Sequence, residues 1–155
     1  MNRRAFLMMT GAAAIANPLH AASCGFDICR SDAEWRDRLS QDEYLVLREE
    51  ATENPHTSLL NVETRAGTYR CRGCDLPVYD AGAKFDSETG WPSFFESLPD
   101  AVGTKEDRRL IFQVRTEVHC RRCGSHLGHI FDDGPEPTGK RHCLNGLSLT
   151  FAPAT

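Results

Sequence analysis

The stretches Cys71-Arg-Gly-Cys74 and Cys120-Arg-Arg-Cys123 place four cysteines in two CxxC motifs, with 45 residues between the motifs. Each motif turns the chain so that two thiolates point at one centre, and two such turns supply the four sulfur ligands that tetrahedral zinc prefers. Gly73 and Gly124 suit the tight backbone of these turns. We therefore predict a structural zinc ion, held by Cys71, Cys74, Cys120 and Cys123, that staples two distant parts of the chain. With all four positions taken by protein, this metal would do no chemistry.

The four cysteines have two other interpretations. A redox-active CxxC motif is expected where a strand leads into a helix, in a βαβ setting. Two structural disulfides would also use all four thiols. We favour zinc over both, because two paired CxxC turns provide the four ligands of a closed zinc site.

The rest of the chain predicts short elements. Ser31 with Glu34, and Ser40 with Glu43, form two capping boxes, each of which predicts the start of a short helix. This helical part ends by residues 54–55, an Asn-Pro pair. Short strands are predicted after it, at residues 68–71, 76–79, 110–118 and 141–151. High turn density and the lack of a long crossover helix favour antiparallel sheets.

Residues 1–23, MNRRAFLMMTGAAAIANPLHAAS, have the layout of a signal peptide, with Arg3 and Arg4, an apolar run and then small residues. The NRRAFL stretch resembles a twin-arginine export signal, and cleavage is expected near Ala21–Ser23. An ordinary N-terminal helix or a transit peptide is an alternative, and AASC at 21–24 is a poor lipoprotein box with Cys24 as its lipid site. The apolar run is too short to span a bilayer, so we expect a periplasmic protein without stable membrane insertion.

The chain is acidic. Its net charge of −4 becomes −6 when residues 1–23 are removed, because that segment holds two arginines and no acid. Phosphate contacts need clustered cations, so we expect no nucleic acid partner. Arginines do lie near the CxxC motifs, at positions 70, 72, 121 and 122. A zinc-ribbon-like binding module without catalysis is therefore kept as the alternative function.

Cys143 lies outside the CxxC motifs, in GKRHCLNGLSL at residues 139–149. If residues 141–151 form one strand, then Arg141, Cys143 and Asn145 project from one face, and the apolar side chains of residues 147, 149 and 151 continue that face as core. A guanidinium beside a thiol lowers the pKa of the thiol and favours the nucleophilic thiolate. The alternative is an inert, half-buried cysteine.

Two further stretches can build a site around this thiol. His126 and His129 directly follow the second CxxC turn, which would hold both imidazoles in place, although a surface or core role is an alternative for each. Gly90-Trp91-Pro92 puts a tryptophan in a turn, where the wall of a binding site would lie, whereas the default role of tryptophan is in the core.

On these residues the chain resembles the methionine-R-sulfoxide reductases of the B type. The resemblance runs over residues 31–153 and is carried by YRCRGCDLPVYD, KFDSETGWPSF, VHCRRCGSHLGHIFDDGPEPTGKRHC and CLNGLSLTF. It implies a mainly β fold of two antiparallel sheets stapled by a four-cysteine zinc site, with short N-terminal helices. It also implies a domain over residues 31–155 that reduces the R epimer of methionine sulfoxide, in proteins or as the free amino acid.

The resemblance assigns roles to residues at matching positions. Cys143 corresponds to the nucleophile, which attacks the substrate sulfur and is left as a sulfenic acid, with the oxygen protonated from the His126/His129 network. Trp91 corresponds to the aromatic that packs on the substrate methyl group. The other pocket positions correspond to Arg141, Asn145 and Phe131. A thioredoxin-like reductant is implied as the partner that restores the enzyme.

The chain departs from the family at the recycling step. Many members have a resolving cysteine directly before the Gly-Trp pair, where this chain has Thr89, which cannot form a disulfide. With four cysteines on zinc, the free thiols are Cys24 and Cys29, and some family members have a resolving cysteine in their N-terminal segment. We predict a flexible segment 24–30 in which Cys29 resolves the sulfenic acid and Cys24 then takes over the disulfide. The alternatives are a plain Cys24–Cys29 disulfide and direct attack by the reductant.

Two smaller departures lie beside the nucleophile. His142 stands where Tyr or Phe is common and, on a strand, faces away from Cys143. Gly146 stands where Ser is more common. We expect little effect of either residue on the chemistry.

Overall fold

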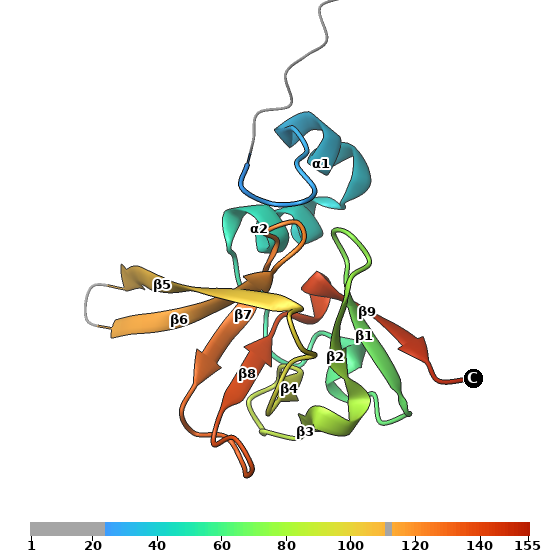
Figure 1. Ribbon diagram of the computed structural model, residues 1–155, viewed down its shortest axis with the longest axis vertical. Helices are drawn as coiled ribbons and strands as arrows, with labels where there is room; N and C mark the ends of the chain where they lie inside the picture. The colour runs from blue at the N-terminus through green and yellow to red at the C-terminus, as the bar shows by residue number, and fades with distance from the viewer. Residues whose placement is uncertain (1–23, 111–112) are drawn as a thin grey trace, which may run out of the picture.

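The computed structural model describes residues 24–110 and 113–155 (Figure 1). The predicted signal peptide, residues 1–23, lies outside the described residues, so export and cleavage stay predictions. Within the described ranges, no helix is long and apolar enough to cross a membrane.

Two short helices come first, α1 (Asp32–Arg38) and α2 (Gln41–Glu49), and they confirm the helix predictions. Both capping boxes are present: the Ser31 and Ser40 hydroxyls each accept a hydrogen bond from the backbone N–H three residues on, and the glutamate at that position accepts one from the N–H of the serine. Helix α1 buries Trp35, which is 3% exposed. The two helices lie together at one end of the molecule (Figure 1).

All strands pair antiparallel in two sheets, as predicted. The smaller sheet has the order β2-β1-β9 and consists of β1 (Gly67–Cys71), β2 (Pro77–Asp80) and β9 (Leu149–Pro153). The larger sheet has the order β3-β4-β8-β7-β6-β5 and consists of β3 (Lys84–Phe85), β4 (Ser93–Phe94), β5 (Val102–Leu110), β6 (Gln113–Cys120), β7 (His126–Phe131) and β8 (Arg141–Leu144). Three short 3-10 helices complete the described elements: η1 (Leu59–Asn61) between α2 and β1, η2 (Ala81–Ala83) between β2 and β3, and η3 (Gly146–Ser148) between β8 and β9.

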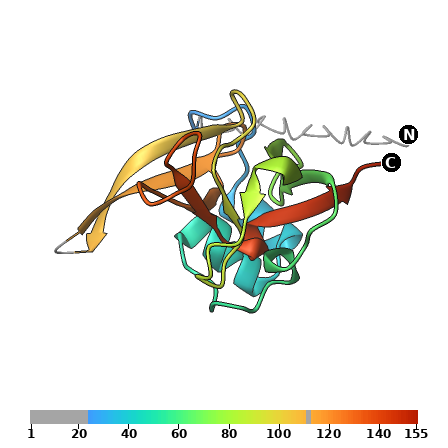
Figure 2. The same cartoon turned by 90° about the horizontal axis from the view of Figure 1, so that it is seen from below.

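The prediction of a single strand over residues 141–151 is wrong. β8 ends at Leu144, η3 follows, and β9 then pairs in the other sheet (Figure 2). The Glu53 carboxylate accepts hydrogen bonds from the backbone N–H groups of Gly146 at 2.5 Å and Leu147 at 3.0 Å. These bonds stabilise a turn at η3, so residues 147–151 do not continue the face that carries Cys143.

The predicted strand at 110–118 is the return strand of a hairpin. β5 and β6 are the two strands of that hairpin, and β6 runs from Gln113 to Cys120. The long partner strand β5 was not predicted, because its residues 104–109 are almost all charged (TKEDRR) and show no apolar alternation.

Aromatic side chains fill the space between the two sheets. Tyr69 of β1 and Tyr79 of β2 pack on Phe94 of β4, with ring centroids 4.8 and 4.7 Å apart, and all three are fully buried. His142 of β8 belongs to the same interior, where its Nδ1 lies 2.9 Å from the Tyr79 hydroxyl. Neighbouring residues of a strand face opposite sides. Cys143 therefore faces away from this core. His142 and Cys143 thus lie on opposite sides of β8, as predicted.

Candidate active site

The two CxxC turns bring four sulfur atoms together. All four cysteine Sγ atoms lie within 4.8 Å of one another, with Cys71 Sγ 3.7 Å from Cys123 Sγ and Cys74 Sγ 3.5 Å from Cys120 Sγ. Zinc with Zn–S bonds of about 2.3 Å separates its sulfur ligands by about 3.8 Å, whereas a disulfide needs about 2.05 Å. The donor set and its spacing therefore fit a four-coordinate metal ion and not a pair of disulfides.

The cluster joins the two sheets next to the candidate site. Cys71 ends β1 of the smaller sheet, and Cys120 ends β6 of the larger one. The second CxxC turn leads directly from β6 into β7, which begins at His126. A metal ion bound here would fix the start of β7 relative to β1. This is the arrangement expected from the sequence.

A small pocket of about 150 Å³ lies beside Cys143. It contains five of the predicted site residues: Trp91, His129, Phe131, Cys143 and Asn145. The other lining residues are Thr52, Arg115, Gly128 and Leu144. A thiol, an aromatic wall and polar donors thus converge on a space suited to one small side chain. A larger cavity of about 910 Å³, between α2, η1 and β9, has no cysteine in its lining.

Cys143 is held between two strands. It lies opposite Ser93 of β4 and His129 of β7 in the antiparallel register. Burial raises the pKa of the Cys143 thiol, and this effect outweighs Arg141, Thr89 and Ser93, each of which lowers that pKa. The sequence prediction that Arg141 lowers the pKa is correct in direction, but the guanidinium does not overcome burial.

Arg141 is engaged mainly with other groups. Its Nε and Nη2 each donate to the Asp133 carboxylate at 2.8 Å, and its guanidinium lies over the Phe131 ring, 4.5 Å from the centroid. Arg141 therefore supports the Phe131 wall from behind and does not line the pocket itself.

The two predicted histidines have different places. His129 lines the pocket, whereas His126 is 1% exposed and lies behind it, with the two ring centroids 5.3 Å apart. His126 Nδ1 is 3.0 Å from Glu117 Oε1. His129 Nε2 is 2.8 Å from Asp107 Oδ2. Burial lowers the pKa of His129, although the Asp107 carboxylate raises it.

Glu53 positions two residues of the pocket wall. Its backbone oxygen accepts a hydrogen bond from Trp91 Nε1 at 3.1 Å, and its backbone N–H donates to Asn145 Oδ1 at 3.0 Å. Asn145 Nδ2 also donates to the Leu127 oxygen at 3.3 Å. The indole and the amide are therefore both fixed by the segment that follows α2.

Thr89, at the position where the resemblance implies a resolving cysteine in many members, has hydroxyl-rich surroundings. Ser87 Oγ is 2.8 Å from Thr89 Oγ1 and 2.7 Å from Ser93 Oγ. Ser93 lies opposite Cys143 in the β4–β8 register, and Thr89 and Ser93 both lower the pKa of the Cys143 thiol. The position at which the resemblance led us to look for a resolving thiol thus begins a chain of hydroxyls that ends at Ser93, opposite the candidate nucleophile.

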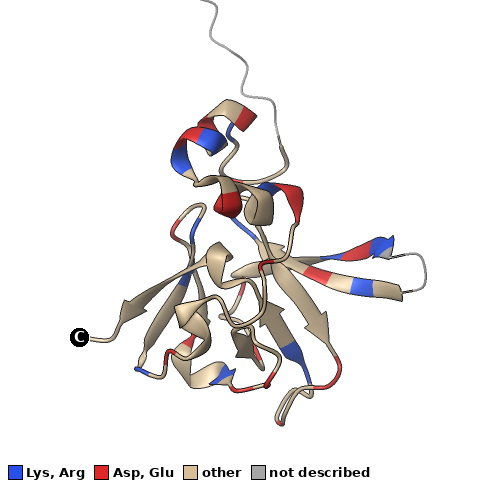
Figure 3. Ribbon diagram, turned by 180° about the vertical axis from the view of Figure 1, so that it is seen from behind, with Lys and Arg blue, Asp and Glu red and all other residues tan. Residues whose placement is uncertain are grey.

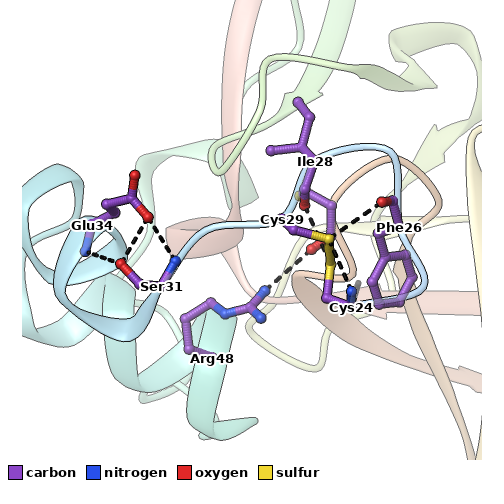
Figure 4. Close-up of a disulfide and its surroundings, with 8 residues drawn as sticks. Cys24, Phe26, Ile28, Cys29, Ser31, Glu34 and Arg48 are labelled. Atoms are coloured by element: carbon purple, nitrogen blue, oxygen red, sulfur yellow. Dashed lines mark hydrogen bonds between the residues drawn. A yellow bond between two sulfur atoms is a disulfide. The ribbon is translucent and has the colours of Figure 1, made fainter. Parts of the chain in front are cut away.

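Cys24 and Cys29 are bonded to each other in a disulfide (Figure 4). Ile28 N–H donates to the Arg122 oxygen at 2.9 Å, and the Phe26 ring packs edge-on against His119, with centroids 5.7 Å apart. Segment 24–30 thus lies against the second CxxC turn, at the helical end of the molecule and apart from β8 (Figure 1). Its predicted flexibility and its reach to the nucleophile stay predictions.

Sequence reasoning missed several residues around the site: Thr52, Glu53, Asp107, Arg115 and Glu117. Arg115 and Glu117 alternate along β6, a pattern that the sequence contains. Asp107 of β5 reaches His129 of β7 across strand β6. Glu53 accepts a hydrogen bond from the N–H of Gly146, which is 93 residues away in the chain. No local pattern reveals contacts of that kind.

Comparisons with known proteins agree with this geometry. The family model described as SelR domain matches residues 39–153. The chain is 52% identical over 130 residues to the peptide methionine sulfoxide reductase MsrB of Leifsonia xyli, which covers 83% of this chain and 93% of that protein. It is 46% identical over 124 residues to MsrB of Agrobacterium fabrum, with 80% and 92% covered, and 48% identical over 120 residues to MsrB of Pseudomonas putida, with 77% and 90% covered. The chain therefore belongs to the SelR-domain family, the methionine-R-sulfoxide reductases of the B type.

Proposed function

We propose that the protein reduces methionine R-sulfoxide to methionine, with Cys143 as the nucleophile. The pocket that brings Cys143, Trp91 and His129 together carries this proposal, and the names of the relatives support it. A sulfoxide has an apolar methyl group on one side and a polar oxygen on the other. Trp91 offers a face for the methyl group, and His129 and Asn145 offer polar atoms for the oxygen.

The reaction transfers oxygen from substrate to enzyme. The Cys143 thiolate attacks the substrate sulfur, and the sulfoxide oxygen takes up a proton from His129. The resulting hydroxyl group passes to the Cys143 sulfur as the substrate S–O bond and the transient bond between the two sulfurs break, and methionine leaves. The sulfoxide gains two electrons, and the Cys143 thiol loses two and becomes a sulfenic acid. His126 lies behind His129, so it acts on the ring of His129 and not on the substrate.

The sulfenic acid then needs a thiol. In our proposal the reductant opens Cys24–Cys29, and the Cys29 thiolate attacks Cys143, which forms a Cys29–Cys143 disulfide and releases water. Cys24 then attacks Cys29, frees the Cys143 thiol and re-forms the Cys24–Cys29 bond, which a thioredoxin-like dithiol reduces. This route requires Phe26 and Ile28 to leave their contacts with the second CxxC turn.

Zinc is the metal that we propose for the Cys71, Cys74, Cys120 and Cys123 cluster, since four thiolates suit its tetrahedral preference. When bound, it supplies no chemistry and holds the two sheets together. We further propose export to the periplasm through the signal of residues 1–23. A twin-arginine route carries folded proteins, so zinc would shield these thiols before the chain meets an oxidising compartment.

The alternative of a binding module has weaker support. Acidic and basic side chains are interleaved over the helices and the β5–β6 hairpin (Figure 3). Two of the arginines near the CxxC motifs pair with carboxylates, Arg70 with Asp75 at 2.8 Å and Arg72 with Glu43 at 3.1 Å. Such paired cations are poor phosphate ligands, and a binding module has no use for a thiol in a pocket.

The test is turnover of racemic methionine sulfoxide, free and in a peptide, with NADPH, thioredoxin reductase and thioredoxin. We expect consumption to stop near half of the substrate, and Cys143→Ser to abolish it. Full activity of Cys143→Ser would overturn the function. Recycling is tested separately with Cys24→Ser, Cys29→Ser and the double variant. If all three keep thioredoxin-driven turnover, the N-terminal route is wrong although the function stands.

A further inference from the structure

Asp107 lies behind the pocket wall and contacts a residue that forms it. Asp107 Oδ2 is 2.8 Å from His129 Nε2 and accepts a hydrogen bond from Arg115 Nη2 at 2.6 Å. Asp107 Oδ1 accepts one from the Arg109 backbone N–H at 2.9 Å. Asp107 is only 6% exposed. Both carboxylate oxygens are therefore occupied, and the orientation of the carboxylate is fixed.

The strand order brings this carboxylate to the site. Asp107 lies opposite Arg115 in the β5–β6 register, and His129 lies opposite Cys143 in the β7–β8 register. β5, β6, β7 and β8 are consecutive in the larger sheet. A line of polar groups thus crosses four strands, from a charged hairpin to the candidate nucleophile.

The geometry also determines where His129 carries its proton. The Arg109 backbone N–H, His129 and Arg115 hold the pKa of Asp107 well below its usual range, against the opposing effect of burial. An ionised carboxylate only accepts hydrogen bonds. His129 Nε2 must therefore carry a hydrogen and donate it to Asp107. Nδ1 is then the nitrogen left to exchange a proton with a molecule in the pocket.

Charged and titratable groups reach His129 from each neighbouring strand. They are Asp107 on β5, Arg115 and Glu117 on β6, His126 on β7, and Cys143 with Arg141 on β8. Burial lowers the pKa of His129, Asp107 raises it, and Arg115 and His126 lower it. Two of these partners, Asp107 and Arg115, thus act on the imidazole with opposite signs while bonded to each other.

We propose that Asp107 is a positioning residue for His129. It holds the ring with the hydrogen on Nε2 and, opposed by Arg115, sets how readily Nδ1 takes up the proton that is later given to the sulfoxide oxygen. Asp107 acts through His129 and does not touch substrate. The effect on catalysis rests on the proposed function, whereas the effect on the imidazole does not.

The test reads the His129 imidazole directly. Long-range ¹H–¹⁵N spectra of the reduced, zinc-loaded protein, residues 24–155, are followed against pH, with the His129 signals assigned from His129→Gln. We expect the Nε2–H tautomer in the unaltered protein. Asp107→Asn should lower the pKa of His129 by roughly one unit, and Arg115→Gln should raise it. Glu106→Gln, which removes a carboxylate paired with Arg108 on the exposed part of β5, should leave it unchanged.

The effect of Asp107 on catalysis is measured by single-turnover reduction of a methionine sulfoxide peptide in the absence of reductant. Asp107→Asn should lower the rate constant by about 10- to 100-fold, which is part of what a positioned general acid contributes, with little change in the substrate concentration for half-maximal rate. Asp107→Glu should restore part of the rate. Shifts of the same sign in Asp107→Asn and Arg115→Gln, or no shift in either, would overturn the proposal. If Asp107→Asn does not fold, the Arg115→Gln variant alone decides: a pKa of His129 that does not rise in this variant would overturn the proposal. A protein that shows the expected shifts but reduces no sulfoxide would refute the function and keep the positioning role.

Discussion

Thr89 stands where the resemblance to the B-type reductases led us to expect a resolving cysteine. Its hydroxyl belongs to the hydroxyl chain through Ser87 to Ser93, which lies opposite Cys143 in the β4–β8 register, and Thr89 lowers the pKa of the Cys143 thiol. We therefore expect a thiol at position 89 to lie within reach of the Cys143 sulfur. We expect Thr89→Cys, in a Cys24→Ser/Cys29→Ser background, to restore thioredoxin-driven turnover through a disulfide to Cys143. Coupled NADPH consumption measures this. Thr89→Ser in the same background is the matched control and should restore nothing; no gain from Thr89→Cys would contradict the placement.

His142 gives the fold a pH dependence. Burial lowers the pKa of His142 to about 4, against about 6.5 for an unfolded histidine. The unfolded chain therefore binds more protons between these values, so this contribution to stability is complete above pH 6.5 and is lost as the pH falls toward 4. The loss amounts to at most about 3 kcal/mol.

We accordingly expect His142→Phe to flatten the dependence of unfolding free energy on pH. Phe cannot take up a proton, so the variant should lose less stability than the unaltered protein between pH 7 and pH 4.5, as measured by urea denaturation. His56→Asn, at an exposed position, is the control and should follow the unaltered protein. Equal slopes for His142→Phe and the unaltered protein would count against the buried, neutral imidazole.

At this scale the sequence identified the reacting groups better than their support. Cys143, Trp91 and His129 were predicted and do meet in one pocket. His126 was placed beside His129 because the two share a motif, yet one faces the pocket and the other is fully buried. Motif spacing cannot separate them, because the difference depends on which strands flank β7, and that order is a property of the folded sheet.

Among the elements, the link β8–η3–β9 carries the chain from one sheet to the other. Gly146 begins η3, and a Cβ built there would overlap the Ser58 side chain next to η1. We expect Gly146→Ala to cost about 1–3 kcal/mol of unfolding free energy, as overpacking of a filled site does. Ser58→Gly removes the obstructing atoms. The double variant Ser58→Gly/Gly146→Ala should therefore lose less unfolding free energy than the two single variants lose in total. A double-mutant cycle measured by chemical denaturation checks this, and additive losses would contradict a direct clash.

The same link shows why some elements were predictable and others were not. The capping boxes and CxxC turns depend on contacts within a few residues, and both were found from the sequence. The alternation of Leu147, Leu149 and Phe151 looks like a continuous strand, but it is interrupted by the carboxylate of Glu53, far away in the chain. A pattern of period two cannot reveal a break that a distant side chain imposes.

In the whole molecule, the two sheets are joined at two places, the sulfur cluster and the aromatic core. Tyr69, Tyr79 and Phe94 hold one region of the interface. The cluster joins the end of β1 to the turn between β6 and β7. The pocket is built from β7, β8 and the loop that carries Trp91, so its geometry depends on where the cluster holds β7.

Removal of the zinc ion that we propose for this cluster should therefore act on the fold first and on catalysis only as a result. We expect a strong chelator, under reducing conditions, to lower the midpoint of thermal unfolding and to broaden the NMR signals of β7, because binding free energy at such a site is folding free energy. Cys74→Ser should do the same without chelator, whereas Cys24→Ser/Cys29→Ser should keep its zinc and its unfolding midpoint. Single-turnover activity should fall in proportion to the unfolded fraction and return when zinc is restored. A site closed by four thiolates leaves no position for a substrate on the metal, so we expect no direct part for zinc in the reaction. Loss of activity in a chelated protein that stays folded would contradict this expectation.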